Sequence, residues 1–186
     1  MDFETVVYTR RAVRAYTDEP VAEPVLRKLI DAAIQAPSAV NEQPWIFAVV
    51  RDREVLKRIS DAAKSHILAR PPPGVSLPHL HEAVENADFD VLYDAPALIV
   101  VCSATQSHWA VENCSLAAEN LMLAARAARL GSCWIGFAQV WLATPEGKAT
   151  INVPATCVPV APIIVGHPSA DPPPVPRKAA NIVWVG

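Results

Sequence analysis

Three arginines stand within five residues near the start of the chain: Arg10, Arg11 and Arg14. A guanidinium presents several N–H donors in a fixed fork, a geometry that suits phosphate oxygens. One short helix further on, residues 36–45 place the hydroxyl of Ser38 and the amide of Asn41 on a turn bracketed by prolines. We interpret the two segments as an anion site and a polar turn. The alternatives are a solvated basic helix end and ordinary capping or turn chemistry.

The hydrophobic pattern predicts the elements that position these residues. One short helix carries Phe3, Val6 and Val7 toward the arginines, and a second begins near Pro24 and stops before Pro37. We expect a helix capped by Asp52 and a long buried helix over 109–130 that ends at Gly131. Strands are expected in four apolar runs: 46–50, 97–102, 132–137 and 158–165. Strands and helices therefore alternate along the chain.

Two proline-rich stretches interrupt this pattern. Residues 65–94 contain a triple proline at 71–73, so we predict a surface excursion beside the site, with a helix over 81–90 and a possible role as a lid. Residues 168–176 predict a stiff, projecting tail. The tail continues into an apolar run at 182–185, which we expect to wrap onto a partner subunit as an added strand.

Composition bounds the class of protein. The 186 residues are expected to form a single domain over 1–186, and the net charge of -3 argues against nucleic acid as a partner. A hydrophobic content of 52% favours a homodimer. The acidic start shows no secretion leader, and charges within 108–130 argue against a membrane span, so we expect a cytoplasmic protein.

Other catalytic classes find little support in the residues. The four cysteines lack metal-ligand spacing and are expected to be buried, so no metal site is predicted. The five histidines have no evident partners, and none is assigned a catalytic role. With six glycines, the chain shows neither a nucleophile elbow nor a glycine-rich phosphate loop. Hydrolase, kinase and Rossmann functions are therefore disfavoured.

The order and spacing of the arginine run and the Ser38 turn resemble the N-terminal signatures of the nitroreductase family of flavin mononucleotide (FMN) enzymes. The resemblance extends through residues 121–125 and 130–137 to a basic residue in the tail, and only 65–94 lacks a match. It implies an α+β fold, with a mixed β-sheet flanked by helices. It also implies an intertwined homodimer with a C-terminal extension, packed through a central helix, with FMN in the interface.

The resemblance assigns cofactor-binding roles residue by residue. Arginines 10, 11 and 14 hold the FMN phosphate and reach the polar edge of the flavin, while Ala12 replaces a common serine and removes one hydroxyl donor. A second group contacts FMN from the other subunit: Pro37, Ser38, Ala39 and Asn41. The backbone of a third group lies against the flavin ring, where an N–H can reach N5: Trp134, Ile135 and Gly136. In the tail, Arg177 completes the phosphate site.

The implied activity is hydride transfer from NAD(P)H to FMN and then to a nitroaromatic, a quinone or a similar small electrophile. Flavin N5 carries the chemistry, so no catalytic side chain is expected. Two alternatives stay open. One is a non-catalytic FMN-binding or carrier protein, and the other is an enzyme of the same fold with different chemistry, such as reductive dehalogenation or flavin fragmentation.

Overall fold

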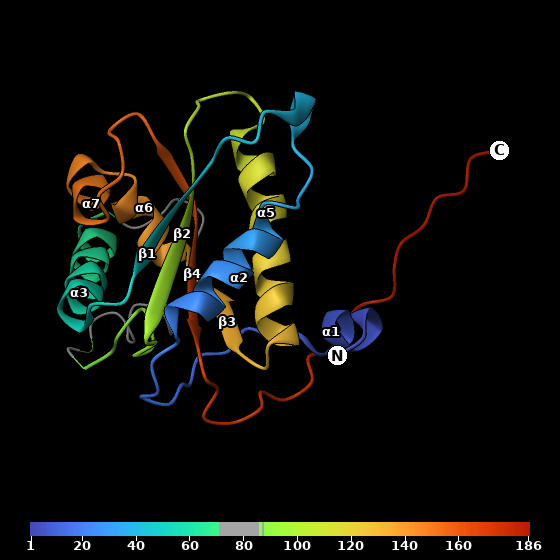
Figure 1. The fold of residues 1–186 in the computed structure, drawn as a ribbon, viewed down its shortest axis with the longest axis horizontal. Coiled ribbons are helices and arrows are strands. Elements are labelled where there is room, and N and C mark those ends of the chain that lie inside the picture. Colours follow the sequence, from blue (N-terminus) through green and yellow to red (C-terminus); the bar gives the residue numbers. More distant parts are fainter. Residues whose placement is uncertain (71–85, 87) are drawn as a thin grey trace.

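The computed structural model describes residues 1–70, 86 and 88–186, in which helices and strands alternate around one sheet (Figure 1). The elements in chain order are α1 (Phe3–Thr9), α2 (Glu23–Ala33), the 3-10 turn η1 (Ala39–Asn41), β1 (Trp45–Val50), α3 (Arg53–Ala69), β2 (Ala97–Ser103), α5 (Ala110–Ala127), β3 (Gly131–Trp134), α6 (Gly136–Leu142), α7 (Pro145–Thr150) and β4 (Val158–Gly166). The predicted α+β class is confirmed.

The four strands form one sheet in the order β1-β2-β4-β3, and all three pairings are antiparallel. The expected mixture of parallel and antiparallel strands is absent from this sheet: within the described residues, parallel pairing is confined to an isolated bridge between Ala12 and Ser132. All seven residues of β2 are buried. The central strands are therefore buried, and the edge strand β3 pairs with the arginine segment, residues 10–14.

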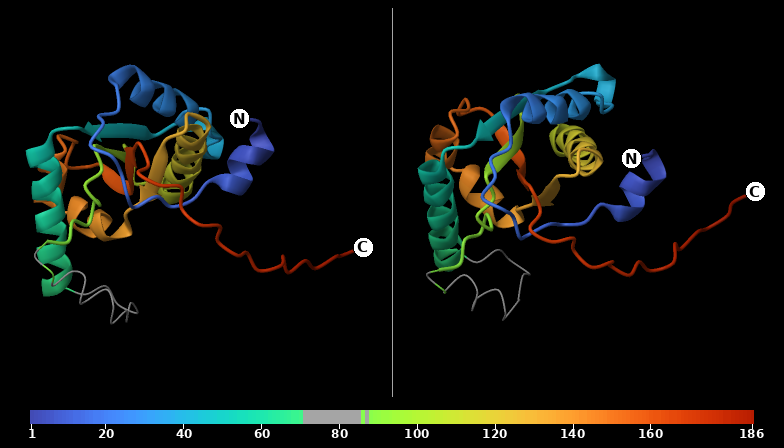
Figure 2. Two further views of the ribbon diagram at one scale, coloured as in Figure 1. Left: turned by 90° about the horizontal axis from the view of Figure 1, so that it is seen from below. Right: turned by 60° about the horizontal axis from the view of Figure 1, so that its bottom comes forward.

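Helices cover both faces of the sheet. Successive side chains of a strand point to opposite faces, and β2 divides accordingly. Ile99 packs with α2 and α5 in one hydrophobic cluster, whereas Leu98 packs with α3 and α6 in the other. Figure 2 shows the helices on the two faces of the sheet from two further directions. Hydrophobic burial on one face packs the inner side of α5 against the sheet.

Local sequence signals set several helix ends. The Asp52 carboxylate accepts hydrogen bonds from the backbone N–H groups of Glu54 and Val55, at 2.9 and 3.0 Å, so the predicted cap is confirmed. The predicted stop at Gly131 is wrong. Helix α5 ends at Ala127, and Arg129 takes the left-handed conformation with φ 61°. The Leu130 N–H then closes the end by donating to Ala125 O at 2.8 Å.

The predicted strand over 132–137 is wrong beyond Trp134. The Ile135 N–H donates to Pro162 O at 2.8 Å, but Pro162 has no N–H with which to return a bond, and the ladder ends there. Helix α6 follows at Gly136. Helix α7 was also missed, although Thr144 caps it through a bond from Gly147 N at 3.1 Å and Pro145 stands in its first turn.

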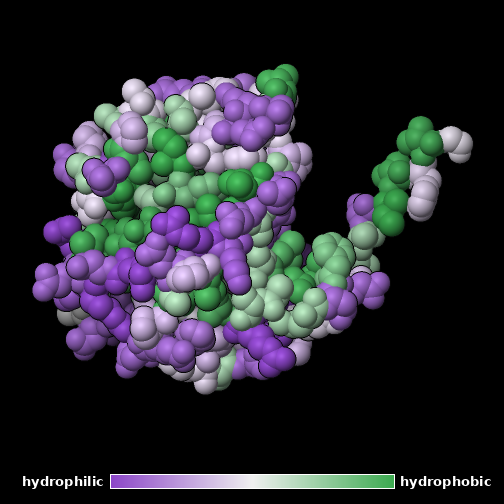
Figure 3. Space-filling model, in the orientation of Figure 1, coloured by the Kyte–Doolittle hydropathy of each residue, from purple (hydrophilic) through white to green (hydrophobic). Residues whose placement is uncertain are grey.

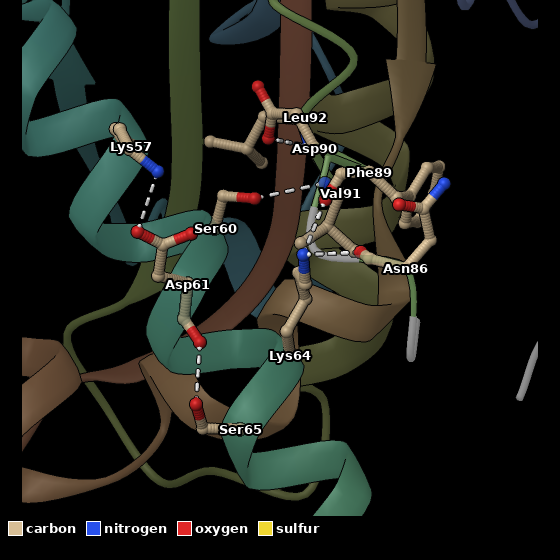
Figure 4. A network of polar contacts seen from close by, with 10 residues as sticks. All are labelled: Lys57, Ser60, Asp61, Lys64, Ser65, Asn86, Phe89, Asp90, Val91 and Leu92. Carbon is tan, nitrogen blue, oxygen red and sulfur yellow. Dashed lines mark hydrogen bonds and ion pairs between the residues drawn. The ribbon is translucent and has the colours of Figure 1, made fainter. Parts of the chain in front are cut away.

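The predicted excursion over 65–94 is wrong at its start, because α3 continues to Ala69. The candidate lid and most of the helix expected over 81–90 lie outside the described residues. Where the described chain returns, α3 holds it (Figure 4). The buried Lys64 Nζ donates to the carbonyls of Asn86 and Phe89 at 2.9 and 2.8 Å, and Ser60 Oγ accepts from Val91 N at 2.9 Å.

The tail, residues 168–186, begins with two backbone contacts to the segment that follows the arginine run. Pro168 bridges to Tyr16, and Ser169 N donates to Ala15 O at 3.1 Å. Beyond Asp171 the chain has no helix or strand, and Trp184 is 86% exposed. Figure 3 shows the C-terminal end as a hydrophobic run that stands clear of the body. The role of the tail as an extension that adds to a partner's sheet stays a prediction.

Candidate functional site

A pocket of about 220 Å³ lies where α1, β3, the end of α5 and the start of the tail meet. Its polar lining consists of Thr9, Arg10, Arg11, Arg126, Ser132 and Asp171. Two of the four predicted arginines, Arg10 and Arg11, therefore share one pocket with a third guanidinium, that of Arg126. Sequence reasoning missed Arg126, because an arginine in the last turn of a helix usually serves only the helix dipole.

The arginine segment is fixed to the sheet through its backbone. Val13 N donates to Ser132 O at 3.0 Å beside the Ala12–Ser132 bridge, and Val13 is buried. This approach requires a glycine at 131. A Cβ there would lie 2.7–2.8 Å from three side-chain atoms of Val13. Gly131 thus serves close packing between β3 and the arginine segment rather than the end of α5.

The pocket's charges are incompletely neutralised. Arg10 Nε lies 3.4 Å from Glu119 Oε1, and Arg126 NH1 lies 3.7 Å from Asp171 Oδ1. Arg11 NH1 donates to the carbonyls of Tyr8 and Arg10, each at 2.8 Å. Within the described residues, the buried Nε of Arg11 has no acceptor, which costs about 1–3 kcal/mol. A ligand with several anionic oxygens fits this donor set.

Arg14 lies outside this pocket. Its guanidinium carbon sits 5.8 Å from the centre of the Tyr93 ring, a cation–π distance. Burial raises the pKa of the neighbouring Cys133 thiol, and the positive charges of Arg14 and Arg10 partly oppose that rise. Arg14 is thus held over an aromatic ring, beside β3, rather than in the pocket with Arg10 and Arg11.

The turn around Ser38 has a strained backbone. Val40, Asn41 and Gln43 have φ values of 47°, 56° and 47°, in the left-handed region, and Val40 is a β-branched residue with 97% exposure. Gln43 N donates to Ser38 Oγ at 3.0 Å, and Gln43 Nε2 donates to Asn41 Oδ1 at 2.7 Å. Ser38 and Asn41 therefore carry the turn chemistry that the sequence left open as their alternative role.

A polar network fastens this turn to α5. The Glu42 carboxylate accepts from Thr105 Oγ1, Ser107 Oγ and Asn113 Nδ2 at 2.8, 2.9 and 3.0 Å. The buried Asn113 also accepts from Ala39 N at 2.9 Å. No local pattern reveals these pairs, since 63 to 74 residues separate the partners. The network holds the turn in its strained conformation.

The turn and the arginine pocket lie at opposite ends of α5. Ala39 contacts Asn113 near the start of the helix, whereas Thr9 contacts Arg126 near its end, with Nε to Oγ1 at 2.9 Å. Thirteen residues at 1.5 Å each separate these contacts by about 20 Å. One chain therefore does not bring together the two groups that the sequence predicted as a single site. Their union across two subunits stays a prediction.

Three further predicted residues, Ile135, Gly136 and Arg177, do not line the arginine pocket. The Ile135 N–H donates to Pro162 O, whereas Gly136 is exposed and a Cβ there would meet no described atom within 4 Å beyond its chain neighbours and its own helix backbone. Arg177 is exposed in the tail and makes no ion pair with the described residues. The part of the chain that is described contains no cluster of three metal-ligating side chains. It also contains no helix with the length and apolar character to cross a membrane.

A helix-covered sheet with a guanidinium pocket at its edge defines a protein suited to a ligand that carries phosphate. The family is shown by comparison. Residues 7–167 match the Nitroreductase family, and the chain belongs to that family. The resemblance inferred from the arginine run and the Ser38 turn is thereby confirmed.

Three known proteins illustrate the relationship. A protein of Archaeoglobus fulgidus, provisionally named an NADH dehydrogenase/NAD(P)H nitroreductase, is 34% identical over 172 residues, covering 89% of this chain and 85% of its own. The 5,6-dimethylbenzimidazole synthase of Rhodospirillum rubrum is 30% identical over 179 residues, covering 88% and 81%. The crystal structure of a Bacteroides fragilis nitroreductase with bound FMN superposes with a TM-score of 0.86, 25% identity and full coverage of both chains.

Proposed function

We propose that this protein is an FMN-dependent oxidoreductase that passes hydride from NAD(P)H to a nitroaromatic, a quinone or a similar small electrophile. The observation that carries the proposal is the guanidinium pocket at the edge of the sheet. Arg10, Arg11 and Arg126 line one small cavity, and Arg11 Nε is buried in need of an acceptor. In a chain of the nitroreductase family, the FMN phosphate is the ligand that suits this donor set.

FMN, when bound, supplies the hydride chemistry by accepting hydride from NAD(P)H and passing it to the electrophile. The chain's own residues bind and orient it. Arg10 and Arg11 neutralise the phosphate, and Arg14 beside β3 supplies positive charge toward the flavin's polar edge. Of the three backbone groups expected at the ring, the Ile135 N–H is bonded to Pro162 O, whereas Gly136 begins α6 with open space beside it and can donate its N–H to the flavin.

We further propose a homodimer in which the Ser38 turn of one subunit completes the arginine site of the other. The two groups lie about 20 Å apart along α5, and a two-fold pairing through this helix would bring unlike ends together. Large apolar side chains are exposed on α1 and α5: Phe3, Val7, Tyr8, Val111 and Leu116. Burial against a second copy accounts for their exposure in the single chain.

The first test is an absorption spectrum of the purified protein, followed by anaerobic addition of NADPH and then NADH. Flavin bands that bleach with either donor, and return on addition of a nitroaromatic or quinone, support the oxidoreductase. Bound flavin that neither donor bleaches indicates a carrier instead. Protein that takes up no FMN when it is supplied contradicts the proposal.

Flavin fragmentation is the second candidate, because one relative over most of the chain is named 5,6-dimethylbenzimidazole synthase. The two activities differ in the fate of the cofactor. An oxidoreductase returns FMN after each turnover, whereas fragmentation consumes it. Chromatography of FMN before and after reduction and exposure to oxygen distinguishes them, and recovery of all the FMN excludes the second candidate.

A further inference from the structure

We propose that Arg126 is a third phosphate-binding arginine of this protein and that Asp171 of the tail is an internal carboxylate that competes with the phosphate for it. The inference rests on the proposed FMN site. Arg126 stands in α5, more than a hundred residues from the arginine run, but lines the same pocket as Arg10 and Arg11.

Thr9 fixes the orientation of the Arg126 guanidinium. The Thr9 hydroxyl has one proton, which it donates to the carbonyl of Thr5, so its oxygen faces Arg126 as an acceptor. Arg126 Nε donates to that oxygen at 2.9 Å. With Nε held in this way, the two terminal nitrogens make no hydrogen bond within the described residues and stay available to a ligand. The side chain is 26% exposed, so solvent and ligand can reach it.

Asp171 holds Arg126 only loosely. The separation from Arg126 NH1 to Asp171 Oδ1 is 3.7 Å, longer than a hydrogen bond, and the Asp171 side chain is 86% exposed. Such an ion pair is weak. A phosphate presents up to two negative charges and three acceptor oxygens, which suit a guanidinium better than one distant carboxylate. The carboxylate and the phosphate therefore compete for Arg126 in the same pocket.

The balance of charges that face the pocket favours the binding of an anion. Three guanidiniums, those of Arg10, Arg11 and Arg126, stand against two carboxylates, Glu119 at Arg10 and Asp171 at Arg126. Both ion pairs are longer than 3 Å, at 3.4 and 3.7 Å, and the side chains of Glu119 and Asp171 are 48% and 86% exposed. The pocket thus keeps a net positive charge for an anion, and removal of either Arg126 or Asp171 changes that charge by one.

The test compares FMN with riboflavin, which lacks the phosphate, by fluorescence titration of the full chain. Arg126→Gln should weaken FMN binding by about tenfold to a hundredfold and leave riboflavin affinity unchanged, while the melting temperature falls only by the loss of the bond to Thr9. Arg126→Lys, which keeps the charge, should recover part of the loss. The matched control is Arg129→Gln, at the same end of α5 but outside the pocket lining, which should bind FMN as the wild type does.

The competition is tested by Asp171→Asn, which should tighten FMN binding by about twofold to fivefold without affecting riboflavin. Unchanged FMN affinity in Arg126→Gln, or an equal loss for riboflavin, overturns the role of Arg126. Unchanged affinity in Asp171→Asn overturns the competition. These failures are distinct from failure of the proposed function, in which wild-type protein binds neither FMN nor riboflavin.

Discussion

Replacement of Gly131 by alanine should destabilise the protein and loosen the arginine pocket together. The added Cβ would lie 2.7, 2.7 and 2.8 Å from Cβ, Cγ1 and Cγ2 of Val13, against the roughly 3.5–4.0 Å of an ordinary carbon contact. Relief requires the arginine segment to move away from β3, which stretches the 3.0 Å bond from Val13 N to Ser132 O. Overpacking of this kind costs about 1–3 kcal/mol.

The expected loss corresponds to a fall in melting temperature of about 2–12 °C for a chain of this size. Urea unfolding measures the stability, and FMN titration measures the pocket, because the same shift displaces Arg10 and Arg11. Gly136→Ala is the matched control for stability alone, since its Cβ would meet no described atom within 4 Å beyond its chain neighbours and its own helix backbone, and it should unfold as the wild type does. The double variant Gly131→Ala/Val13→Ala removes both γ-carbons and should lose less than the two single changes summed. Native stability and native FMN affinity in Gly131→Ala would refute the steric argument.

Three further outcomes are expected. Asn113→Ala should lower the free energy of unfolding by about 2–4 kcal/mol in urea, because it leaves Ala39 N without its acceptor and removes a donor to a carboxylate; a change below 0.5 kcal/mol would contradict the anchoring role. Burial raises the pKa values of Cys102 and Cys114 to about 12, so these thiols should resist a disulfide reagent at pH 8 until denaturant is added, and prompt labelling of the folded protein would be inconsistent with this. Hydrogen bonds from Thr5 N and Oγ1 lower the pKa of Asp2 in the folded state, so its stabilisation of α1 is present at neutral pH and is lost as the pH falls through that lowered pKa; the Thr5 amide shift should follow this titration, and an invariant shift would argue against the cap.

The sequence predicted elements whose signals are local. Pro24 marked the first turn of α2, Asp52 capped α3, and unbroken apolar runs marked β2 and β4. The strand over 132–137 was predicted too long because its end depends on Pro162 in another strand. Thr144 and Pro145 were a readable helix start that we overlooked.

The candidate site was predictable only in part for the same reason. Adjacent arginines are visible in a sequence, whereas the meeting of Arg126 with Thr9 depends on how α1 packs against α5. Glu42 had no distinguishing local pattern, and its three donors all come from residues beyond 100. Whether Arg177 approaches the pocket is set by the path of an extended tail, which neighbouring residues do not determine.

The length of helix α5 sets the distance between the Ser38 turn and the arginine pocket. Each residue of an α-helix advances 1.5 Å and turns 100° about the axis, so one residue inserted between Asn113 and Arg126 would rotate one functional end away from the other. The sheet on one side leaves no room for α5 to absorb that rotation. Natural variants of this protein should therefore keep the same number of residues in α5. Insertions in the extended part of the tail should change only how far the tail extends from the body.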